Sequence, residues 1–406
     1  MKEADRIELG NLCPEVVDSI FSRIPLKSLA KLKSVSKTWC NFIEHFRRRN
    51  PPTTASGLTI VLKNLNRNLR NPEFQESTFL RTQEGQQGFF STHACIKGNF
   101  PVRLINSCKG LLLYAANDGL SWAYYVCSPF LDQCLALPRA HSITRLACAS
   151  LALDGSSKEN FRVLCFFLKE IDFVRGTIGC KIFSSATWDW REFQATILNT
   201  DLMLKRDFDV AHLFGPSVFC RGRLYWIWSL CMLVYDNEAE FFKLIPLPSK
   251  AEEGNYGRPL DMLSQLLWES DGSIYFCYQM NERLCIYKFI GDDEVMDQEH
   301  GRYSSMEGCC MWQFSHFVTL KEFLWQEFYG TVNGEVKKLR AKCGIKPCGF
   351  NQDLQLLYLH VPPGTIVAYS LETRELEQVW ACGEFKGNYA IEKILPFLFK
   401  SVNLFV

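Results

Sequence analysis

The residues of this sequence with the widest chemical scope are its 18 cysteines and seven histidines. Thiolates and imidazoles can bind zinc, but structural zinc sites carry their ligands in short pairs such as Cys-x2-Cys. No Cys-x2-Cys occurs, and the nearest approaches are Cys309-Cys310, Cys343-x4-Cys348 and His93-x-Cys95. We therefore predict no metal site and no cofactor, and we expect the cysteines to act as small buried hydrophobic residues.

Signatures of catalysis are also missing from the sequence. It contains no Gly-x-Gly-x-x-Gly, no Gly-x4-Gly-Lys-Ser/Thr and no His-Glu-x-x-His, and no local pattern singles out a Cys–His pair. Histidines occur one at a time along the chain, at His93, His141, His212, His300, His316 and His360 among others. We therefore predict no catalytic residues.

The charge of the chain is close to balanced, with 45 basic and 44 acidic residues. A net charge of +1 gives no global field for nucleic acid or an anionic membrane. Residues 1–50 carry ten Lys or Arg against six Asp or Glu, an excess of +4 that we interpret as a solvated helix face. The N-terminus lacks an apolar signal region, and the longest nearly apolar run, 224–235, is too short to span a bilayer. We expect a soluble protein of the cytoplasm and/or nucleus, whose thiols stay reduced rather than forming a disulfide framework.

The elements that position these residues fall into two regions with different periods. Apolar residues recur at intervals of three and four from Pro14 to Phe46, in three short segments. The segments carry Val16, Val17, Ile20, Phe21 and Ile24; then Leu26, Leu29 and Leu32; then Val35, Trp39, Phe42 and Ile43. Pro25 ends the first, and Pro51-Pro52 sets a boundary near residue 50. Three helices in about 35 residues bury little surface alone, so we expect a partner to complete this module.

From Gly57 onward the pattern is that of short strands separated by turns. The predicted strands are 58–62, 110–115, 122–127, 161–168, 181–185, 223–228, 231–236, 273–278, 283–289, 354–361 and 365–371. Turn pairs such as Asp271-Gly272 and Asn333-Gly334 lie between them, and no helical pattern alternates with them.

The strand pattern repeats loosely, as in residues 110–138 and 222–248, where each unit ends in Leu-Pro. Such four-stranded antiparallel units build a β-propeller, and the length of 51–406 allows six or seven blades. We expect strand 58–62 to share a blade with the C-terminal strands, including 401–406. An open two-sheet sandwich is the alternative.

Tryptophans occur in two pairs at a spacing of two, Trp188 with Trp190 and Trp226 with Trp228. Residues two apart on a strand share a face. We interpret these pairs as packing between blades, with an exposed recognition platform as the alternative.

The segment from Asn11 to Phe46 resembles an F-box. The matching elements, in order, are Leu12 with a nearby proline, Ile20-Phe21, Arg23-Ile24-Pro25, Leu26-Lys-Ser-Leu29 and Val35-Ser-Lys-Thr-Trp39. One departure is Cys13, which separates Leu12 from Pro14 where the family has adjacent Leu-Pro.

The later repeats resemble the F-box-associated, kelch-like propellers of plant F-box families. The resembling pieces are Ser107-Cys-Lys-Gly110-Leu-Leu, the Ser128-Pro129 corner, Ser184-Ser185 with Trp190-Arg-Glu, Arg223-Leu-Tyr-Trp226, and Trp312 with His316. The two resemblances imply a multidomain α plus all-β chain. Its parts would be a tail over 1–10, a three-helix F-box over 11–50 and a propeller over 51–406.

The resemblance further implies a substrate-recognition subunit of a Skp–cullin–F-box ubiquitin ligase. Its F-box would bind a Skp-type adaptor, and through it cullin and a RING protein, while the propeller would hold a protein substrate. The adaptor-binding set implied is Leu12, Pro14, Val17, Ile20, Phe21, Ile24, Pro25, Leu29, Leu32, Val35 and Trp39. Some of these must form the module's own core; we expect Leu12, Pro14, Ile24 and Pro25 mainly to face the partner. No substrate-binding residues are predicted.

Three other functions stay open. The first is a non-degradative scaffold in which the F-box binds the adaptor without cullin, and the second is a propeller that binds a small ligand. The third, a propeller enzyme, is disfavoured because the sequence has no repeated Ser-x-Asp-x-Gly-x-x-Trp turns and no grouped histidines.

Overall fold

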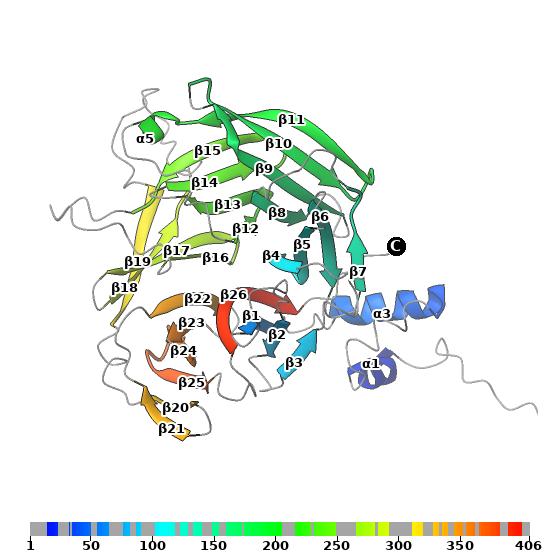
Figure 1. The fold of residues 1–406 in the computed structure, drawn as a ribbon. Helices are drawn as coiled ribbons and strands as arrows, with labels where there is room; N and C mark the ends of the chain where they lie inside the picture. Colours follow the sequence, from blue (N-terminus) through cyan, green and yellow to red (C-terminus); the bar gives the residue numbers. More distant parts are fainter. Residues whose placement is uncertain are drawn as a thin grey trace, which may run out of the picture.

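Among the described residues, two helices form the N-terminal part, and mostly antiparallel sheets follow (Figure 1). The computed structural model describes residues 14–22, 32, 35–49, 55–64, 76–81, 87–90, 102–117, 122–128, 133–139, 148–153, 160–172, 174–204, 216–228, 231–248, 265–280, 283–291, 311–319, 328–332, 335–339, 345–351, 355–361, 365–381 and 389–399. No helix within these ranges has both the length and the hydropathy required to cross a membrane.

Two of the three predicted N-terminal helices are confirmed, as α1 (Pro14–Ser22) and α3 (Lys37–Arg49). Pro14 suits the first turn of α1, where its missing N–H has no intrahelical partner. Ser36 caps α3, because its Oγ accepts a hydrogen bond from the backbone N–H of Trp39 at 3.2 Å. Of the second predicted helix, only Leu32 lies among the described residues.

Within the described ranges, most of the strands form six groups of four, which we number as blades one to six. Blade one contains β26 (Tyr389–Phe399), β1 (Ala55–Asn64), β2 (Glu76–Arg81) and β3 (Gln87–Phe90). Blade two contains β4 (Val102–Cys108), β5 (Leu111–Asn117), β6 (Trp122–Ser128) and β7 (Gln133–Ala136). Blade three contains β8 (Cys148–Leu153), β9 (Phe161–Asp172), β10 (Thr177–Ser184) and β11 (Asp189–Leu198).

The other three blades follow the same plan. Blade four contains β12 (Val218–Cys220), β13 (Arg223–Trp228), β14 (Cys231–Asp236) and β15 (Phe241–Pro246). Blade five contains β16 (Gln265–Ser270), β17 (Ser273–Met280), β18 (Arg283–Phe289) and β19 (Trp312–Thr319). Blade six contains β22 (Lys346–Asn351), β23 (Leu356–Val361), β24 (Thr365–Ser370) and β25 (Leu376–Ala381). Outside these blades lie a short helix, α5 (Asp201–Leu204), and a two-stranded ribbon of β20 (Phe328–Val332) and β21 (Glu335–Leu339).

The blades are arranged in a ring, which makes the sheet domain a propeller. The first strand of each blade contacts the first strand of the next, in the order β4, β8, β12, β16, β22, β26 and back to β4. Figure 1 shows the blades placed in the same order around the centre of the ring, where these strands lie. The open two-sheet sandwich is therefore wrong.

The ring closes by pairing the two ends of the sheet domain. β1 runs antiparallel to β26, from Ala55 opposite Phe399 to Asn64 opposite Tyr389, with one register shift. This confirms that predicted strand 58–62 shares a blade with a C-terminal strand. Residues 401–406, which were predicted to join it, lie outside the described residues.

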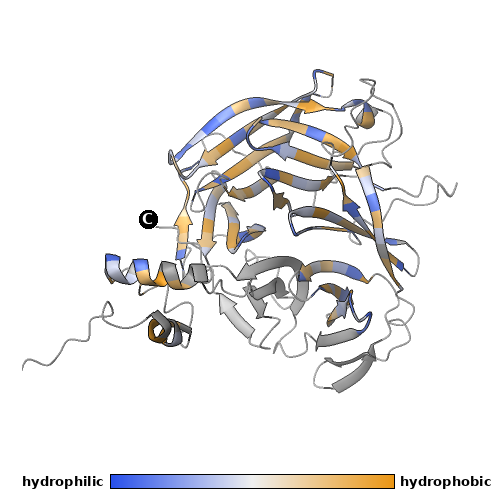
Figure 2. Cartoon of the chain, turned by 180° about the vertical axis from the view of Figure 1, so that it is seen from behind, coloured by the Kyte–Doolittle hydropathy of each residue, from blue (hydrophilic) through white to orange (hydrophobic). Residues whose placement is uncertain are grey.

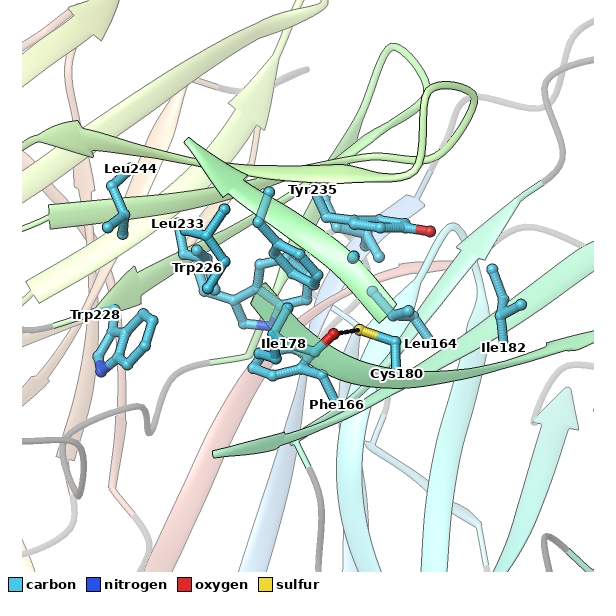
Figure 3. Packing of buried hydrophobic residues seen from close by; sticks show 14 of the residues in the cluster. Leu164, Phe166, Ile178, Cys180, Ile182, Trp226, Trp228, Leu233, Tyr235 and Leu244 are labelled. Atoms are coloured by element: carbon cyan, nitrogen blue, oxygen red, sulfur yellow. Dashed lines mark hydrogen bonds between the residues drawn. The ribbon is translucent and has the colours of Figure 1, made fainter. Parts of the chain in front are cut away.

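The core between blades three and four contains the second tryptophan pair. Trp226 and Trp228 project from one face of β13, and both are fully buried (Figure 3). The ring of Phe166 meets Trp226 edge-on, with centroids 5.4 Å apart. Trp226 Nε1 donates a hydrogen bond to Ser150 Oγ at 3.0 Å, so its polar atom is satisfied. The prediction that this pair packs between blades is confirmed.

The first tryptophan pair is divided between a turn and a strand. Trp188 lies in the turn between β10 and β11, with φ 58° and its side chain exposed, whereas Trp190 is on β11. The prediction that both share a strand face is therefore wrong, although both rings contact Phe183. Trp190 Nε1 donates to the carbonyl of Pro138 at 2.7 Å and so joins blade three to blade two.

The same kind of contact joins blades four and five. Trp312, at the start of the outer strand β19, donates from Nε1 to the carbonyl of Pro246 at 2.9 Å. In both junctions the acceptor lies at or just after the end of the preceding blade's outer strand. The acceptor in blade two belongs to Leu137-Pro138 of the sequence repeat, and the acceptor in blade four directly precedes Leu247-Pro248.

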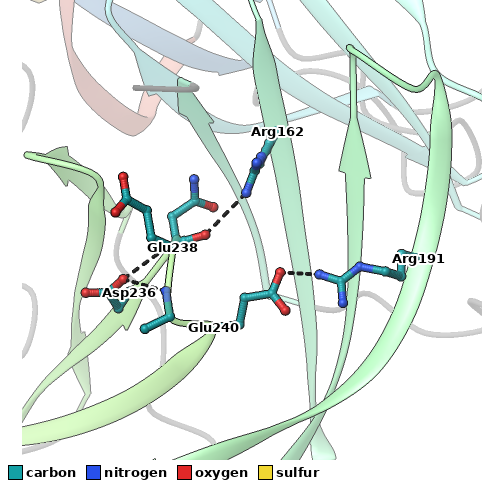
Figure 4. Close-up of polar contacts among 7 residues, drawn as sticks. Arg162, Arg191, Asp236, Glu238 and Glu240 are labelled. Carbon is teal, nitrogen blue, oxygen red and sulfur yellow. Dashed lines mark hydrogen bonds and ion pairs between the residues drawn. The ribbon is translucent and has the colours of Figure 1, made fainter. Parts of the chain in front are cut away.

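The turn between β14 and β15 is organised by Asp236 (Figure 4). Its carboxylate accepts hydrogen bonds from the backbone N–H groups of Glu238 and Ala239 and from Arg223 Nε at 2.8 Å. Partial burial opposes ionisation of this carboxyl, but the three donors outweigh it and lower the pKa of Asp236. The ionised side chain thus holds the turn closed.

Two arginines of blade three reach this turn of blade four (Figure 4). Arg162 donates to the carbonyl of Asn237 at 3.2 Å, and Arg191 forms an ion pair with Glu240. The outer strands β11 and β15 also pair, in parallel. Ile197 lies opposite Phe242, and Leu198 lies opposite Lys243. Blades three and four therefore form a continuous eight-stranded sheet. In Figure 2, β11 carries hydrophilic colour along much of its length, as expected for an outer strand.

The cysteines require one correction. Cys127 and Cys134 face each other on β6 and β7, with Cα atoms 4.0 Å apart, and are joined by a disulfide. The expectation of reduced thiols is wrong for this pair, because the hairpin register places the two residues directly opposite one another. Nine other cysteines in the described ranges are not part of a disulfide, and eight of these are buried. Burial raises the pKa of Cys108 and of Cys165 to about 12, so these thiols stay protonated near neutral pH.

Candidate functional site

The N-terminal helices are held together by a small aromatic core. Val17 and Phe21 of α1 are buried against Ile43 and Phe46 of α3. The rings of Phe21 and Phe46 meet edge-on, with centroids 5.5 Å apart, and Phe21 also lies 6.0 Å from Trp39. Residues 17 and 21 are one helical turn apart, so a single stripe of α1 forms this contact.

A second apolar stripe on α1 faces away from this core. Val16 and Ile20, again one turn apart, are each 43% exposed, and Val35, just before α3, is 62% exposed. We call these three side chains the exposed apolar set. Each would lose apolar surface to a partner, at about 25 cal/mol per Å² buried. A small module that leaves aliphatic side chains exposed has the character of a docking surface.

The predicted adaptor-binding residues separate into three groups. Val17 and Phe21 are core residues, and Leu32 and Trp39 are partly buried against that core. Ile20 and Val35 belong to the exposed apolar set, and Pro14 begins α1. Leu12, Ile24, Pro25 and Leu29 lie outside the described residues. Contact of any of these side chains with an adaptor remains a prediction.

One surface residue was absent from the predicted set. Val16 is as exposed as Ile20 and lies on the same face of α1. The sequence contained the signal, because Val16 and Ile20 are four residues apart within the apolar pattern. The pattern alone did not show which of two adjacent stripes, 16 and 20 or 17 and 21, would face α3.

The chemistry available in this module is burial of apolar surface. No group of three or more His, Cys, Asp or Glu residues is placed to hold a metal ion, either in this module or elsewhere in the described ranges. On the propeller, five large apolar side chains are exposed among the residues that the structure describes: Val174, Trp188, Leu198, Phe314 and Phe317. These are the apolar positions from which a propeller partner could be contacted.

Comparison with known proteins identifies the helical module. The F-box domain profile matches residues 9–50, which include α1, α3 and the exposed apolar set. The chain is 27% identical over 261 residues to F-box protein At5g49610 of Arabidopsis thaliana, a match that covers 61% of this chain and 68% of that protein. The chain carries an N-terminal F-box domain and is similar to plant F-box proteins.

Other similar Arabidopsis proteins extend the likeness into the propeller. F-box protein At5g07610 is 24% identical over 294 residues, which are 66% of this chain and 64% of that protein. F-box/LRR-repeat/kelch-repeat protein At2g27520 is 23% identical over 249 residues, 59% of this chain and 61% of that one. The matches thus span about two thirds of these relatives' lengths. An F-box domain implies a Skp-type adaptor as its partner and a substrate-adaptor role in Skp–cullin–F-box ubiquitin ligases.

Proposed function

We propose that this F-box protein is the substrate-recognition subunit of a Skp–cullin–F-box ubiquitin ligase, acting in the cytoplasm and/or nucleus. In this proposal the F-box binds a Skp-type adaptor, cullin and a RING protein join through that adaptor, and the propeller holds a protein substrate. The F-box match over residues 9–50, together with the exposed apolar set on the same residues, carries the proposal.

The proposed mechanism needs no acid, base or nucleophile from this chain. Ubiquitin transfer requires that a substrate lysine be kept near the loaded enzyme, which two linked binding surfaces achieve by raising its effective concentration. A rigid propeller suits this role because its blades are joined to one another. The contacts from Trp190, Trp312, Arg162 and Arg191 each cross a blade boundary.

The test of this proposal targets the exposed apolar set. In Val16→Asp with Ile20→Asp, we expect affinity for a Skp-type adaptor to fall at least tenfold, because two carboxylates would enter an apolar interface. The measurement is titration calorimetry with the purified adaptor. The matched control is Val174→Asp on the propeller, where the valine is 95% exposed. Unchanged adaptor affinity in the double variant, with the helices still folded, would contradict the proposed surface.

A second measurement separates the ligase from a scaffold. The wild-type complex with adaptor, cullin and RING protein should ubiquitinate the F-box protein itself or a bound substrate. Adaptor binding without cullin recruitment would instead support the non-degradative scaffold.

A further inference from the structure

One face of blade five is lined by aromatic side chains from three consecutive strands. They are Phe276 and Tyr278 on β17, Tyr287 and Phe289 on β18, and Phe314 and Phe317 on β19. Pairing in the sheet places Tyr278 opposite Cys285 and Phe276 opposite Tyr287, so these residues project to the same side. The inner part of this face packs against blade four, where Phe276 and Tyr278 are buried.

A β-bulge brings the two outer phenylalanines to this same side. Phe314 and Phe317 are three residues apart and would face opposite sides of a regular strand. The register shifts between Ile286 and Tyr287, so that Phe314 lies opposite Tyr287 and Phe317 lies opposite Cys285. The extra residue in β19 is Ser315. Bulges re-aim side chains in this way, and here the result is two neighbouring aromatic rings on one face.

Blade four covers the inner part of this face of blade five but not its outer edge. Trp312 is buried where it meets Pro246 of blade four, but Phe314 and Phe317 are each 50% exposed. Both rings are held in place by their neighbours. Tyr287 contacts Phe314 edge-on, with centroids 5.5 Å apart, and the guanidinium of Arg283 lies 5.0 Å from the centre of the Phe317 ring. The exposed rings are therefore ordered by ring and cation–π contacts before any partner arrives.

The charge of these two strands is positive. β18 contains Arg283 and Lys288, and neither β18 nor β19 contains an aspartate or glutamate. Arg283 is exposed and Lys288 is partly so. An arginine beside exposed aromatic rings is the composition found at the energetic centres of protein interfaces. Its guanidinium can bind a carboxylate with two parallel hydrogen bonds while the rings accept an apolar side chain.

We propose that Arg283, Tyr287, Phe314 and Phe317, which we call the β19 surface, bind an acidic protein segment that carries an aromatic side chain. The partner ring packs on Phe314 and Phe317, and a neighbouring carboxylate pairs with Arg283. The inference rests on the proposed function, in which the propeller holds a protein substrate, and it names the surface that does so and the chemistry that it selects.

The other exposed apolar positions of the propeller give less support for a binding site. Val174 and Leu198 are single exposed aliphatic side chains. Trp188 is a single exposed ring, and its edge-on contact is with Phe183, which is fully buried. The β19 surface combines two exposed rings, a third ring and a cation within one pair of strands.

The test uses the full chain bound to its Skp-type adaptor and a fluorescent ten-residue probe peptide that alternates Ser, Glu and Phe. Two matched peptides replace every Glu by Lys or every Phe by Ala. We expect fluorescence anisotropy to show at least tenfold tighter binding of the Glu-Phe peptide than of either matched peptide. Equal affinity for the Glu-Phe and Lys-Phe peptides would overturn the proposal.

Variants then assign the binding to the surface. Phe314→Ser with Phe317→Ser should lower affinity for the Glu-Phe peptide at least tenfold, and Arg283→Glu should reverse the preference toward the Lys-Phe peptide. Val174→Ser is the control and should bind as the wild type does. Binding that survives both changes overturns the proposal. Self-association that the double variant abolishes, with no peptide binding, also overturns it in favour of a second copy of the chain.

These outcomes are separable from those of the proposed function. Arg283→Glu changes an exposed residue at the end of β18, so it keeps the test valid if the double variant loses its cooperative thermal transition. Adaptor affinity should be unchanged in every β19 variant. Loss of peptide binding with intact adaptor binding fails only the β19 surface, whereas failure of the wild type to bind adaptor fails the proposed function.

Discussion

Among the described residues of the propeller, His360 is the one whose pKa shift most directly predicts an effect of pH on stability. It lies on β23 directly opposite Lys346 on β22, and its Nε2 is buried without a hydrogen-bond partner among the described residues. Burial, with a smaller contribution from the Lys346 charge, lowers the pKa of His360 to about 4. The imidazole is therefore neutral in the folded protein at neutral pH.

This pKa shift predicts loss of stability in mild acid. Between about pH 6.5 and pH 4 the unfolded chain binds a proton at His360 that the folded chain does not, so the free energy of unfolding falls as pH falls. His360→Gln should reduce this decline, measured by urea denaturation at pH 7.5 and pH 4.5. Lys346→Met, which removes the facing charge, should reduce it in part. Equal declines in wild type and His360→Gln would contradict the assignment.

At the residue scale, the sequence predicted which side chains are apolar but not which face each would take. The pattern of α1 contained both stripes, and only the position of α3 decides that Val17 and Phe21 are core while Val16 and Ile20 are exposed. The Cys127–Cys134 disulfide was missed for a similar reason. It depends on the register of β6 with β7, which composition and spacing do not give.

At the scale of elements, the strands found in the sequence are mainly the middle two of each blade. Strands such as β13 and β14 are covered on both sides, so their residues form unbroken apolar runs. The outer strand β11 is largely exposed, and the innermost strand β12 has only three residues. Neither carries a long apolar run or clean alternation, which is why both escaped prediction.

The hairpins that join the first two strands of a blade are a repeated element with a common backbone requirement. Positive φ occurs at both central residues in Lys109-Gly110, Arg221-Gly222 and Asp271-Gly272, the pattern of a type I′ turn. Gly222→Ala should therefore lower the free energy of unfolding by about 1 kcal/mol, because φ is +79° there and nothing lies within 4 Å of an added Cβ.

The control for this prediction is Gly222→Asn at the same position. Asparagine tolerates positive φ better than alanine, so it should cost clearly less in urea denaturation. A smaller loss for alanine than for asparagine would show that φ is not the cause.

At the scale of the whole molecule, the sequence repeat predicted a ring of blades. The closure of this ring decides whether the blades unfold as one cooperative unit. β26 pairs with β1 in blade one and also contacts β22 and β4, the first strands of its two neighbouring blades. β26, the last strand among the described residues, thus contacts strands of three blades at once. In a closed ring of packed blades, loss of this strand opens the ring and exposes the free side of β1.

Truncation after residue 388 tests this closure. We expect the shortened chain to lose its cooperative thermal transition or to aggregate, because an unpaired inner strand edge is exposed. A synthetic peptide of residues 389–399 should restore the transition by strand addition, since the eleven residues contain every position that pairs with β1. Truncation after residue 399 is the matched control and should melt as the full chain does. A chain ending at 388 that melts at the wild-type temperature would mean that the remaining blades stabilise the ring without its closing strand.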